Sequence, residues 1–235
     1  MKLKIKLTVP LMAFAVTLTS ASARSFEGVT WVQNTTEQPH QDSSGSGITP
    51  STSGAMNNQG RFDFEISTSS TSSTQRQEWK YDRHEGLTRM DLRFRINSKH
   101  TNFHKISIAQ CHDDQSGSEG VFSIYQVRRE GDKYYFGVQG DVEEADNVYS
   151  QFPTTEIKFD TWYSLSIRTN TDGRNNSYEY GAVRDVNNGN KVIWTNTIVG
   201  GGDSESYYKL GAYRLTGGEG PFSVSFEQIM FFEGS

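Results

Sequence analysis

The chain of 235 residues contains one cysteine, Cys111, and five prolines. A single cysteine excludes an intramolecular disulfide and a metal site built from several thiolates, so an apolar core has to stabilise the fold. No spacing typical of a metal site links the histidines outside the motifs described below, which are His40, His84, His100 and His104. We therefore expect neither a metal nor another cofactor.

Long apolar runs are also missing, apart from a short one near the N-terminus. Residues 7–18 are mostly apolar, but this run is too short to span a membrane, and it is preceded by Lys2, Lys4 and Lys6. Ala21-Ser22-Ala23 follows and fits a small-residue cleavage site. This order is typical of an export signal, so we expect a secreted or periplasmic protein, cut after Ala23, with no membrane partner.

An excess of basic charge is absent too. Removal of residues 1–23 leaves 20 basic and 28 acidic residues, a net charge of about −8 for the mature chain. Affinity for nucleic acid requires a basic surface, so we expect no nucleic-acid partner. Affinity for any other polyanion has to come from local clusters of basic side chains.

Short segments of alternating polar and apolar residues make up most of the chain. Alternation predicts strands at 61–66, 90–96, 105–112, 121–128, 133–140, 161–169, 178–185, 191–199, 207–215 and 222–232. The Ser- and Gly-rich remainder of 38–73 predicts loops, and Asn188-Gly189 predicts a hairpin turn. We therefore expect one all-β domain over 24–235, an antiparallel two-sheet jelly roll with a concave substrate groove, acting as a monomer.

Three stretches place polar side chains on one side of a strand: Arg76-Gln77-Glu78-Trp79-Lys80, Gln110-Cys111-His112 and Lys209-Leu210-Gly211-Ala212-Tyr213. Side chains in a strand alternate between its two faces, so one face of each stretch can pack on a core. The other face then shows basic groups, an amide, an imidazole and a phenol. Such groups suit an anionic ligand.

Other chemistries have less support. A glycoside hydrolase needs two carboxylates at a fixed separation, and the candidates, Asp63 with Glu65 and Glu143-Glu144 with Asp146, form no clear pair by spacing. The chain has no Gly-x-Ser-x-Gly motif and no phosphate-binding loop. Cys111 next to His112 is a poor nucleophile and base pair, because neighbours in a strand point to opposite faces.

Taken together and in this order, the three stretches resemble the signature of alginate lyases of polysaccharide lyase family seven: Arg-(Ser/Thr)-Glu-Leu-Arg, Gln-(Ile/Val)-His and Tyr-x-Lys-Ala-Gly-x-Tyr-x-Gln. The third motif begins at Tyr207 in this chain. Lys80 stands where the family has Arg, and Leu215 where it has Gln. These departures also fit a sister family of jelly-roll polyuronate lyases, such as the glucuronan lyases.

The resemblance implies an enzyme that cleaves a uronic-acid polymer by β-elimination and leaves 4,5-unsaturated uronate ends, with alginate as first choice and glucuronan second. It implies that Arg76, Gln110 and His112 neutralise the uronate carboxylate and that Tyr213 moves the protons. Lys209, Glu78 and Lys80 would bind substrate. Because a phenol has an ordinary pKa near ~10, Tyr213 needs nearby cations such as Lys209 or Arg76 to become a base.

The stereochemistry at C4 and C5 of the uronate determines which residue acts as the base. In mannuronate or glucuronate the proton and the departing oxygen leave from the same side, so Tyr213 could serve as base and then acid. In guluronate they leave from opposite sides, with neutral His112 as base and Tyr213 as acid. The alternative is a non-catalytic β-sandwich module that only binds an acidic glycan.

Overall fold

A computed structural model of the protein describes residues 26, 28–37, 39–44, 60–67, 75–115, 118–140, 149–151, 156–171, 178–199, 205–215 and 220–235. The predicted leader over 1–23, its cleavage site and the acidic candidates at 143–146 lie outside these residues.

Strands make up nearly all of the described chain, as the alternation predicts. They are β1 (Trp31–Gln33), β2 (His40–Ser44), β3 (Phe62–Ile66), β4 (Arg76–Lys80), β5 (His84–Ile96), β6 (Lys105–Gln115), β7 (Ser118–Glu130), β8 (Lys133–Gly140), β9 (Tyr149–Gln151), β10 (Tyr163–Thr171), β11 (Tyr178–Asp185), β12 (Lys191–Val199), β13 (Glu205–Arg214) and β14 (Phe222–Gly234). The one helix of the described residues is the 3₁₀-helix η1 (Val186–Asn188). No helix among them is long and apolar enough to cross a membrane.

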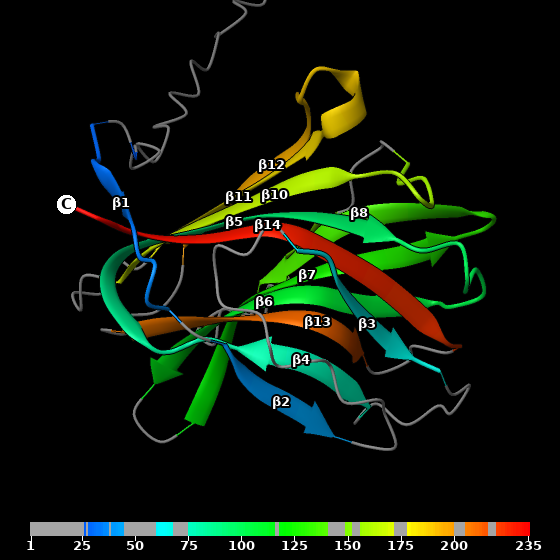
Figure 1. Ribbon diagram of the computed structural model, residues 1–235, viewed down its shortest axis with the longest axis horizontal. Coiled ribbons are helices and arrows are strands. Elements are labelled where there is room, and N and C mark those ends of the chain that lie inside the picture. Colours follow the sequence, from blue (N-terminus) through cyan, green and yellow to red (C-terminus); the bar gives the residue numbers. More distant parts are fainter. Residues whose placement is uncertain are drawn as a thin grey trace, which may run out of the picture.

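The strands form two antiparallel sheets joined at one point. Sheet A contains β12-β11-β10-β5-β14, with β1 and β3 both paired to β14. Sheet B has the order β2-β4-β13-β6-β7-β8-β9. The start of β5 crosses between them, because His84 and Glu85 pair with β13 while the rest of β5 pairs within sheet A. Figure 1 shows β5 curving from the lower strands β4 and β13 to the upper strands β10 and β14.

The core lies between the two sheets and uses the apolar positions of each alternating strand. Sheet B contributes Trp79, Leu210 and Cys111, each at most 2% exposed. Sheet A contributes the alternate residues Met90, Leu92, Phe94 and Ile96 of β5 together with side chains of β10 and β14. Aromatic rings pack edge to face across this layer, with the rings of Phe64 and Trp79 5.2 Å apart. In β5 the apolar side chains are therefore the buried ones, as the alternation predicts.

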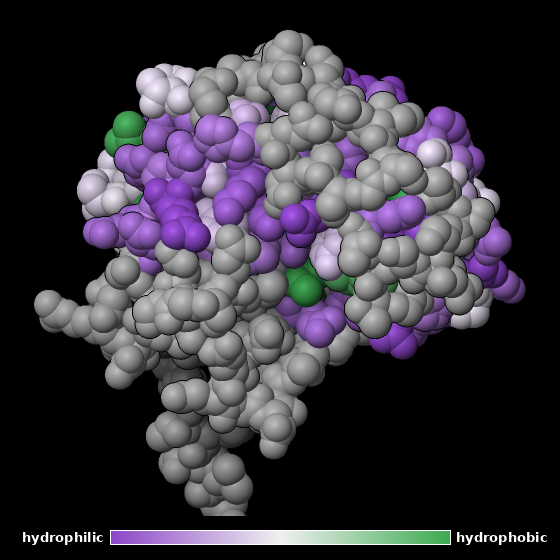
Figure 2. All heavy atoms as spheres, turned by 90° about the horizontal axis from the view of Figure 1, so that it is seen from below, coloured by the Kyte–Doolittle hydropathy of each residue, from purple (hydrophilic) through white to green (hydrophobic). Residues whose placement is uncertain are grey.

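The predicted jelly-roll fold is confirmed, and two local predictions have different outcomes. The hairpin predicted at Asn188-Gly189 joins β11 to β12, with Gly189 in the left-handed conformation at φ 62°. The segment His40–Ser44, predicted as loop, is instead the edge strand β2 paired with β4. Seen from below in Figure 2, the described surface is mostly hydrophilic, with hydrophobic residues only in isolated places.

Candidate active site

The three motif stretches become neighbouring strands, with β13 in the middle between β4 and β6. Lys209 lies directly opposite Lys80 on one side and Gln110 on the other. On the same side of the sheet, Tyr207 faces His112 two residues before Lys209, and Tyr213 faces Arg76 four residues after it. The register therefore places all seven predicted site residues on one side of sheet B, the side away from the core. We call this the polar face: Arg76, Glu78, Lys80, Gln110, His112, Tyr207, Lys209, Gly211 and Tyr213.

Gly211 makes this arrangement possible. It lies opposite Glu78 on β4, and its φ of 149° falls in a range that L side chains rarely adopt. A Cβ at this position would lie 2.2 Å from the carbonyl oxygen of Gln77 and 2.7 Å from the Cα of Glu78. Because Gly211 has no side chain, the side chains of the two outer strands can meet across the middle strand.

A chain of hydrogen bonds uses that space. The amide Nε2 of Gln110 donates to Oε1 of Glu78 at 2.6 Å, and Nε2 of His112 lies 3.2 Å from Oε1 of Gln110. An ionised carboxylate only accepts, so the amide nitrogen of Gln110 turns toward Glu78 and its oxygen turns toward His112. His112 must then donate from Nε2, which leaves the lone pair of the neutral ring on Nδ1.

Tyr207 supports the same histidine from the side. Its ring stacks on the imidazole of His112 with centroids 4.8 Å apart and planes 9° apart. Three cations surround the Tyr207 ring: the ammonium of Lys80 at 4.3 Å, the guanidinium of Arg83 at 5.7 Å and the ammonium of Lys209 at 5.8 Å from its centroid. The buried ring thereby holds positive charge next to the imidazole.

Tyr213 is half-buried beside Arg76 and Glu78. Burial raises the pKa of its phenol, and the negative charge of Glu78 raises it further, while the charge of Arg76 lowers it by less. The sequence predicts that Tyr213 needs nearby cations to act as a base; the effect of Arg76 on its pKa is smaller than the opposing effects of burial and Glu78. Tyr213 is a neutral phenol at neutral pH, ready to donate a proton.

Two further residues belong to this face and were missed from the sequence. Tyr207 begins the third motif, and because side chains alternate along a strand, its spacing from Lys209 was the signal that it lies on this side. Gln126 on β7 lies directly opposite Ser107, which in turn faces Tyr213. Gln126 is fully buried, and within the described residues neither polar atom of its amide has a hydrogen-bond partner. An unsatisfied amide at this position can bind a ligand.

The fold and the site define a class of protein. A jelly roll that gathers an imidazole, a phenol, an amide and several cations on one face of a curled sheet is typical of enzymes that degrade acidic polysaccharides. A family model described as alginate lyase matches residues 6–233. The chain therefore belongs to the alginate lyase family, within polysaccharide lyase family 7, and is a polysaccharide lyase acting on polyuronates.

Solved structures of alginate lyases share the fold at low sequence identity. Family 7 alginate lyase A1-II′, in complex with the product GGG, is 17% identical over 77% of this chain and 83% of its own, with a TM-score of 0.53. The exolytic alginate lyase AlyA5 from Zobellia galactanivorans is 13% identical over 74% and 85%, with a TM-score of 0.55. The alginate lyase from Klebsiella pneumoniae is 10% identical over 77% and 83%, with a TM-score of 0.52. Comparison with curated protein sequences finds no match.

Proposed function

We propose that the protein cleaves alginate by β-elimination on the polar face of sheet B. The observation that carries this proposal is the meeting of Arg76, Gln110, His112 and Tyr213 on three adjacent strands. In the reaction the C5 proton passes to a base and the C4–O bond breaks. The departing oxygen takes a proton from an acid, and a C4–C5 double bond remains. The new chain end is a 4,5-unsaturated uronate.

The difficult step is removal of a proton from carbon, which places extra negative charge on the uronate carboxylate. Arg76, Gln110 and His112 stabilise that charge, with Lys80 and Lys209 adding positive potential from the same face. Groups that are fixed before substrate arrives stabilise developing charge without having to reorganise. The bond from Gln110 to Glu78 at 2.6 Å and the stacking of His112 on Tyr207 provide this fixation.

The protonation of Tyr213 favours one stereochemical route. The raised pKa keeps the Tyr213 phenol protonated, so it already carries the proton that the leaving oxygen needs and can serve as the acid. Neutral His112 then serves as the base from the opposite side, the arrangement that guluronate requires. Mannuronate and glucuronate require Tyr213 to lose its proton first. We therefore propose that guluronate-rich alginate is the preferred substrate, ahead of polymannuronate and glucuronan.

The test is the absorbance of the unsaturated product while the purified protein is incubated in parallel with polyguluronate, polymannuronate and glucuronan. We expect the fastest rise with polyguluronate. In Tyr213→Phe the rise should fall by on the order of 100-fold or more, with polymer binding retained. Unchanged turnover in this variant would refute the role of Tyr213, and the absence of product from all polymers, with binding retained, would favour a non-catalytic glycan-binding module.

We also propose that the protein is exported and monomeric. Export is supported by the basic, apolar and small-residue segments of 1–23. The N-terminal sequence of protein recovered from the periplasm or the medium should begin at Arg24. Size-exclusion chromatography with light scattering should give the mass of one chain, and a larger mass would refute the monomer.

A further inference from the structure

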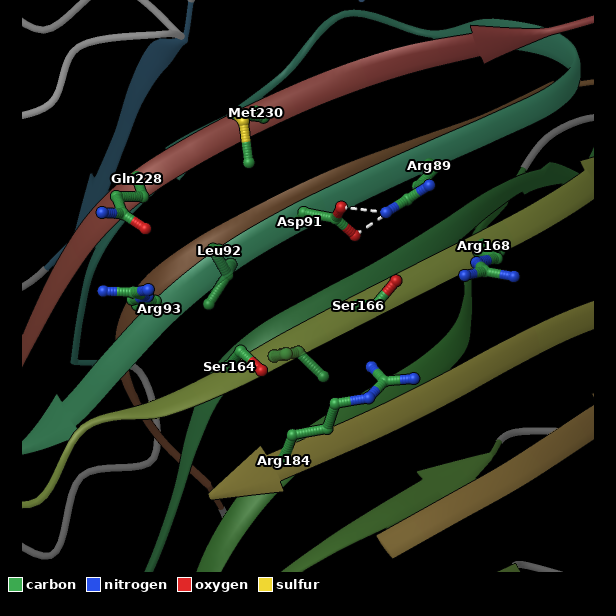
Figure 3. Close-up of a pocket in the computed structure, with 11 residues that line it drawn as sticks. Arg89, Asp91, Leu92, Arg93, Ser164, Ser166, Arg168, Arg184, Gln228 and Met230 are labelled. Carbon is green, nitrogen blue, oxygen red and sulfur yellow. Dashed lines mark hydrogen bonds and ion pairs between the residues drawn. The ribbon is translucent and has the colours of Figure 1, made fainter. Parts of the chain in front are cut away.

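A second polar site lies on the outer face of sheet A, on the other side of the molecule's core from the polar face. A hollow of about 260 Å³ opens there over β5, β10 and β11, with four arginines around it: Arg89, Arg93, Arg168 and Arg184. We call it the arginine hollow. Figure 3 shows these side chains around Ser166, with the guanidinium of Arg184 extending toward the centre.

The register explains why this part of the sheet is hollow. Three rows of outward-facing residues cross the strands, and the middle row holds the small residues Ser166 and Ala182 beside Asp91. The row on one side contains Arg93 and Arg184, and the row on the other side contains Arg89 and Arg168. Long side chains at the corners and small ones at the centre leave a depression with a positively charged rim.

Carboxylates neutralise only part of this rim. Arg89 bonds to Asp91, with Nε 2.9 Å from Oδ1, and Arg93 lies 3.4 Å from a carboxylate oxygen of Glu227. Arg168 packs on the rings of Phe26 and Tyr180 instead, at 5.9 Å and 5.7 Å. Within the described residues neither Arg168 nor Arg184 forms an ion pair. Four guanidinium groups thus face two carboxylates, and the hollow carries excess positive charge.

An unsatisfied donor lies on the floor of the hollow. Ser166 is 6% exposed and lines the hollow, and its hydroxyl has no hydrogen-bond partner in the part of the chain that the structure describes. Nε of Arg168 is likewise buried without a partner. Buried polar groups are normally hydrogen-bonded, so two such donors at one hollow indicate a ligand with acceptor oxygens. Burial lowers the pKa of Arg168 and the charge of Arg89 lowers it further, and the opposing charge of Asp91 does not cancel these effects.

We propose that the arginine hollow binds carboxylate groups of a polyuronate chain, as a second binding site separate from the polar face. Guanidinium groups bind carboxylates through paired hydrogen bonds, and Ser166 adds a neutral donor from below. At about 260 Å³ the hollow is smaller than the pockets of roughly 300–1,000 Å³ that hold drug-sized ligands, so it suits one sugar unit of a chain. The choice of a polyuronate rests on the function proposed above. Binding there would keep a long polymer on the enzyme between cleavage events.

The experiment compares three proteins in the Tyr213→Phe background by affinity electrophoresis in gels that contain alginate. They are the background itself, the background with Arg168→Ala and Arg184→Ala, and the background with Arg129→Ala and Lys133→Ala, a control pair from the β7–β8 hairpin that also removes two positive charges. We expect the double variant of the hollow to bind alginate about 10-fold more weakly at low salt, which corresponds to about 1.4 kcal/mol, and the control pair to bind nearly unchanged. Equal weakening by both would show general charge attraction and overturn the proposal.

Two further measurements distinguish a failure of this proposal from a failure of the proposed alginate lyase activity. In the otherwise unaltered enzyme, the double variant should lose activity on long alginate at low concentration and keep full activity on a short oligosaccharide that fills only the polar face. Phenylglyoxal labelling of the wild-type protein, read by mass spectrometry, should show Arg168 and Arg184 protected by alginate but not by a neutral glucan. Absence of protection would overturn the arginine hollow as a binding site even if the enzyme is an alginate lyase. Protection without turnover would retain the hollow and refute the catalytic proposal.

Discussion

The polar face of sheet B and the arginine hollow of sheet A both present cations to an acidic ligand, but they hold them differently. On the polar face Glu78, Gln110, His112 and Lys209 are each at most 5% exposed. They are tied together across three strands. In the arginine hollow the side chains of Arg89 and Arg93 stay 25% and 35% exposed, and two of the four arginines have no ion-pair partner among the described residues.

This difference corresponds to two tasks. A site that stabilises charge in a transition state has to fix its donors in advance, and burial strengthens each interaction. A site that only retains a polymer needs excess charge and a shape, and its side chains can remain mobile. Variants of the polar face, of the junction between the sheets and of the arginine hollow test this difference, and the largest effect is expected on the polar face.

Gly211→Ala should damage the polar face most. The new Cβ would come within 2.2 Å of the carbonyl oxygen of Gln77, so β13 and β4 would have to separate. We expect the free energy of unfolding to fall by about 3 kcal/mol or more, with loss of turnover. Gly131→Ala is the matched control, because Gly131 also has a positive φ of 63° but nothing lies within 4 Å of its added Cβ. It should cost only about 1–2 kcal/mol. Urea unfolding measures both, and equal losses would contradict the close-approach explanation.

Gln126→Leu should separate activity from stability. The amide of Gln126 is buried without a partner in the described structure, so its replacement by an apolar group of similar size removes no hydrogen bond. We expect the free energy of unfolding to stay the same or rise, while KM for polymer increases by about 10-fold, the equivalent of one lost hydrogen bond. A variant with normal KM would show that Gln126 does not contact substrate.

His84 lies where β5 crosses between the two sheets, and a variant there measures how much its ion pairs stabilise the fold. Its Nε2 lies 3.0 Å from Oε2 of Glu37 and its Nδ1 3.5 Å from Oε1 of Glu233. Burial lowers the pKa of His84, but the hydrogen bond and charge of Glu37, with the charges of Glu233 and Asp82, raise it by more, so the net shift is upward. The stabilisation of the folded state by charged His84 is fully present below the ordinary histidine pKa near ~6.5. It is lost as the pH rises through the higher pKa that His84 has in the folded state.

We therefore expect His84→Asn to lose about 1–2 kcal/mol of unfolding free energy at pH ~5.5 and less at pH ~9. His40→Asn is the control, since the His40–Asp82 pair is 66% and 63% exposed, and it should have almost no effect at either pH. Urea titrations at the two pH values give the comparison. A loss for His84→Asn that grows with pH would refute the charged pair.

Arg184→Ala should have the smallest effect on folding. The side chain lies at the rim of the arginine hollow and forms no ion pair among the described residues, so the free energy of unfolding should change by less than about 0.5 kcal/mol. Thermal unfolding followed by circular dichroism measures this. A larger loss would mean that the arginine supports the sheet rather than a ligand.

Local pattern was sufficient to predict much of this molecule. Alternation in Arg76–Lys80 and Glu205–Arg214 correctly separated the core side from the polar side, because successive side chains of a strand point to opposite faces. Burial alone does not separate the two sides, since most residues of both strands are buried. Alternation did not reveal His40–Ser44, which is polar throughout and forms an edge strand through backbone hydrogen bonds to β4.

Strand order could not be predicted from local pattern. Placing β13 between β4 and β6 depends on pairing between segments far apart in the chain, and only the resemblance to a family suggested that they meet. The arginine hollow was missed for the same reason: Arg89, Asp91 and Arg93 alternate visibly in the sequence, but Arg168 and Arg184 join them only through the register of β5, β10 and β11. The net effect of burial and Glu78 on the pKa of Tyr213 likewise depended on the three-dimensional arrangement.

The central position of β13 also orders the events of folding. β4 and β6 come early in the chain and pair with β2 and β7, but not with each other; both also pair with β13, which follows almost all other strands in sequence. Pairings between such distant segments form slowly, because a long loop has to close first. During synthesis β5, β10 and β11 of sheet A can begin to associate while β4 and β6 still lack the strand that lies between them. A chain that ends before β13 would lack Lys209 and Tyr213 and the strand that holds β4 beside β6, so it would be inactive whatever else it had folded.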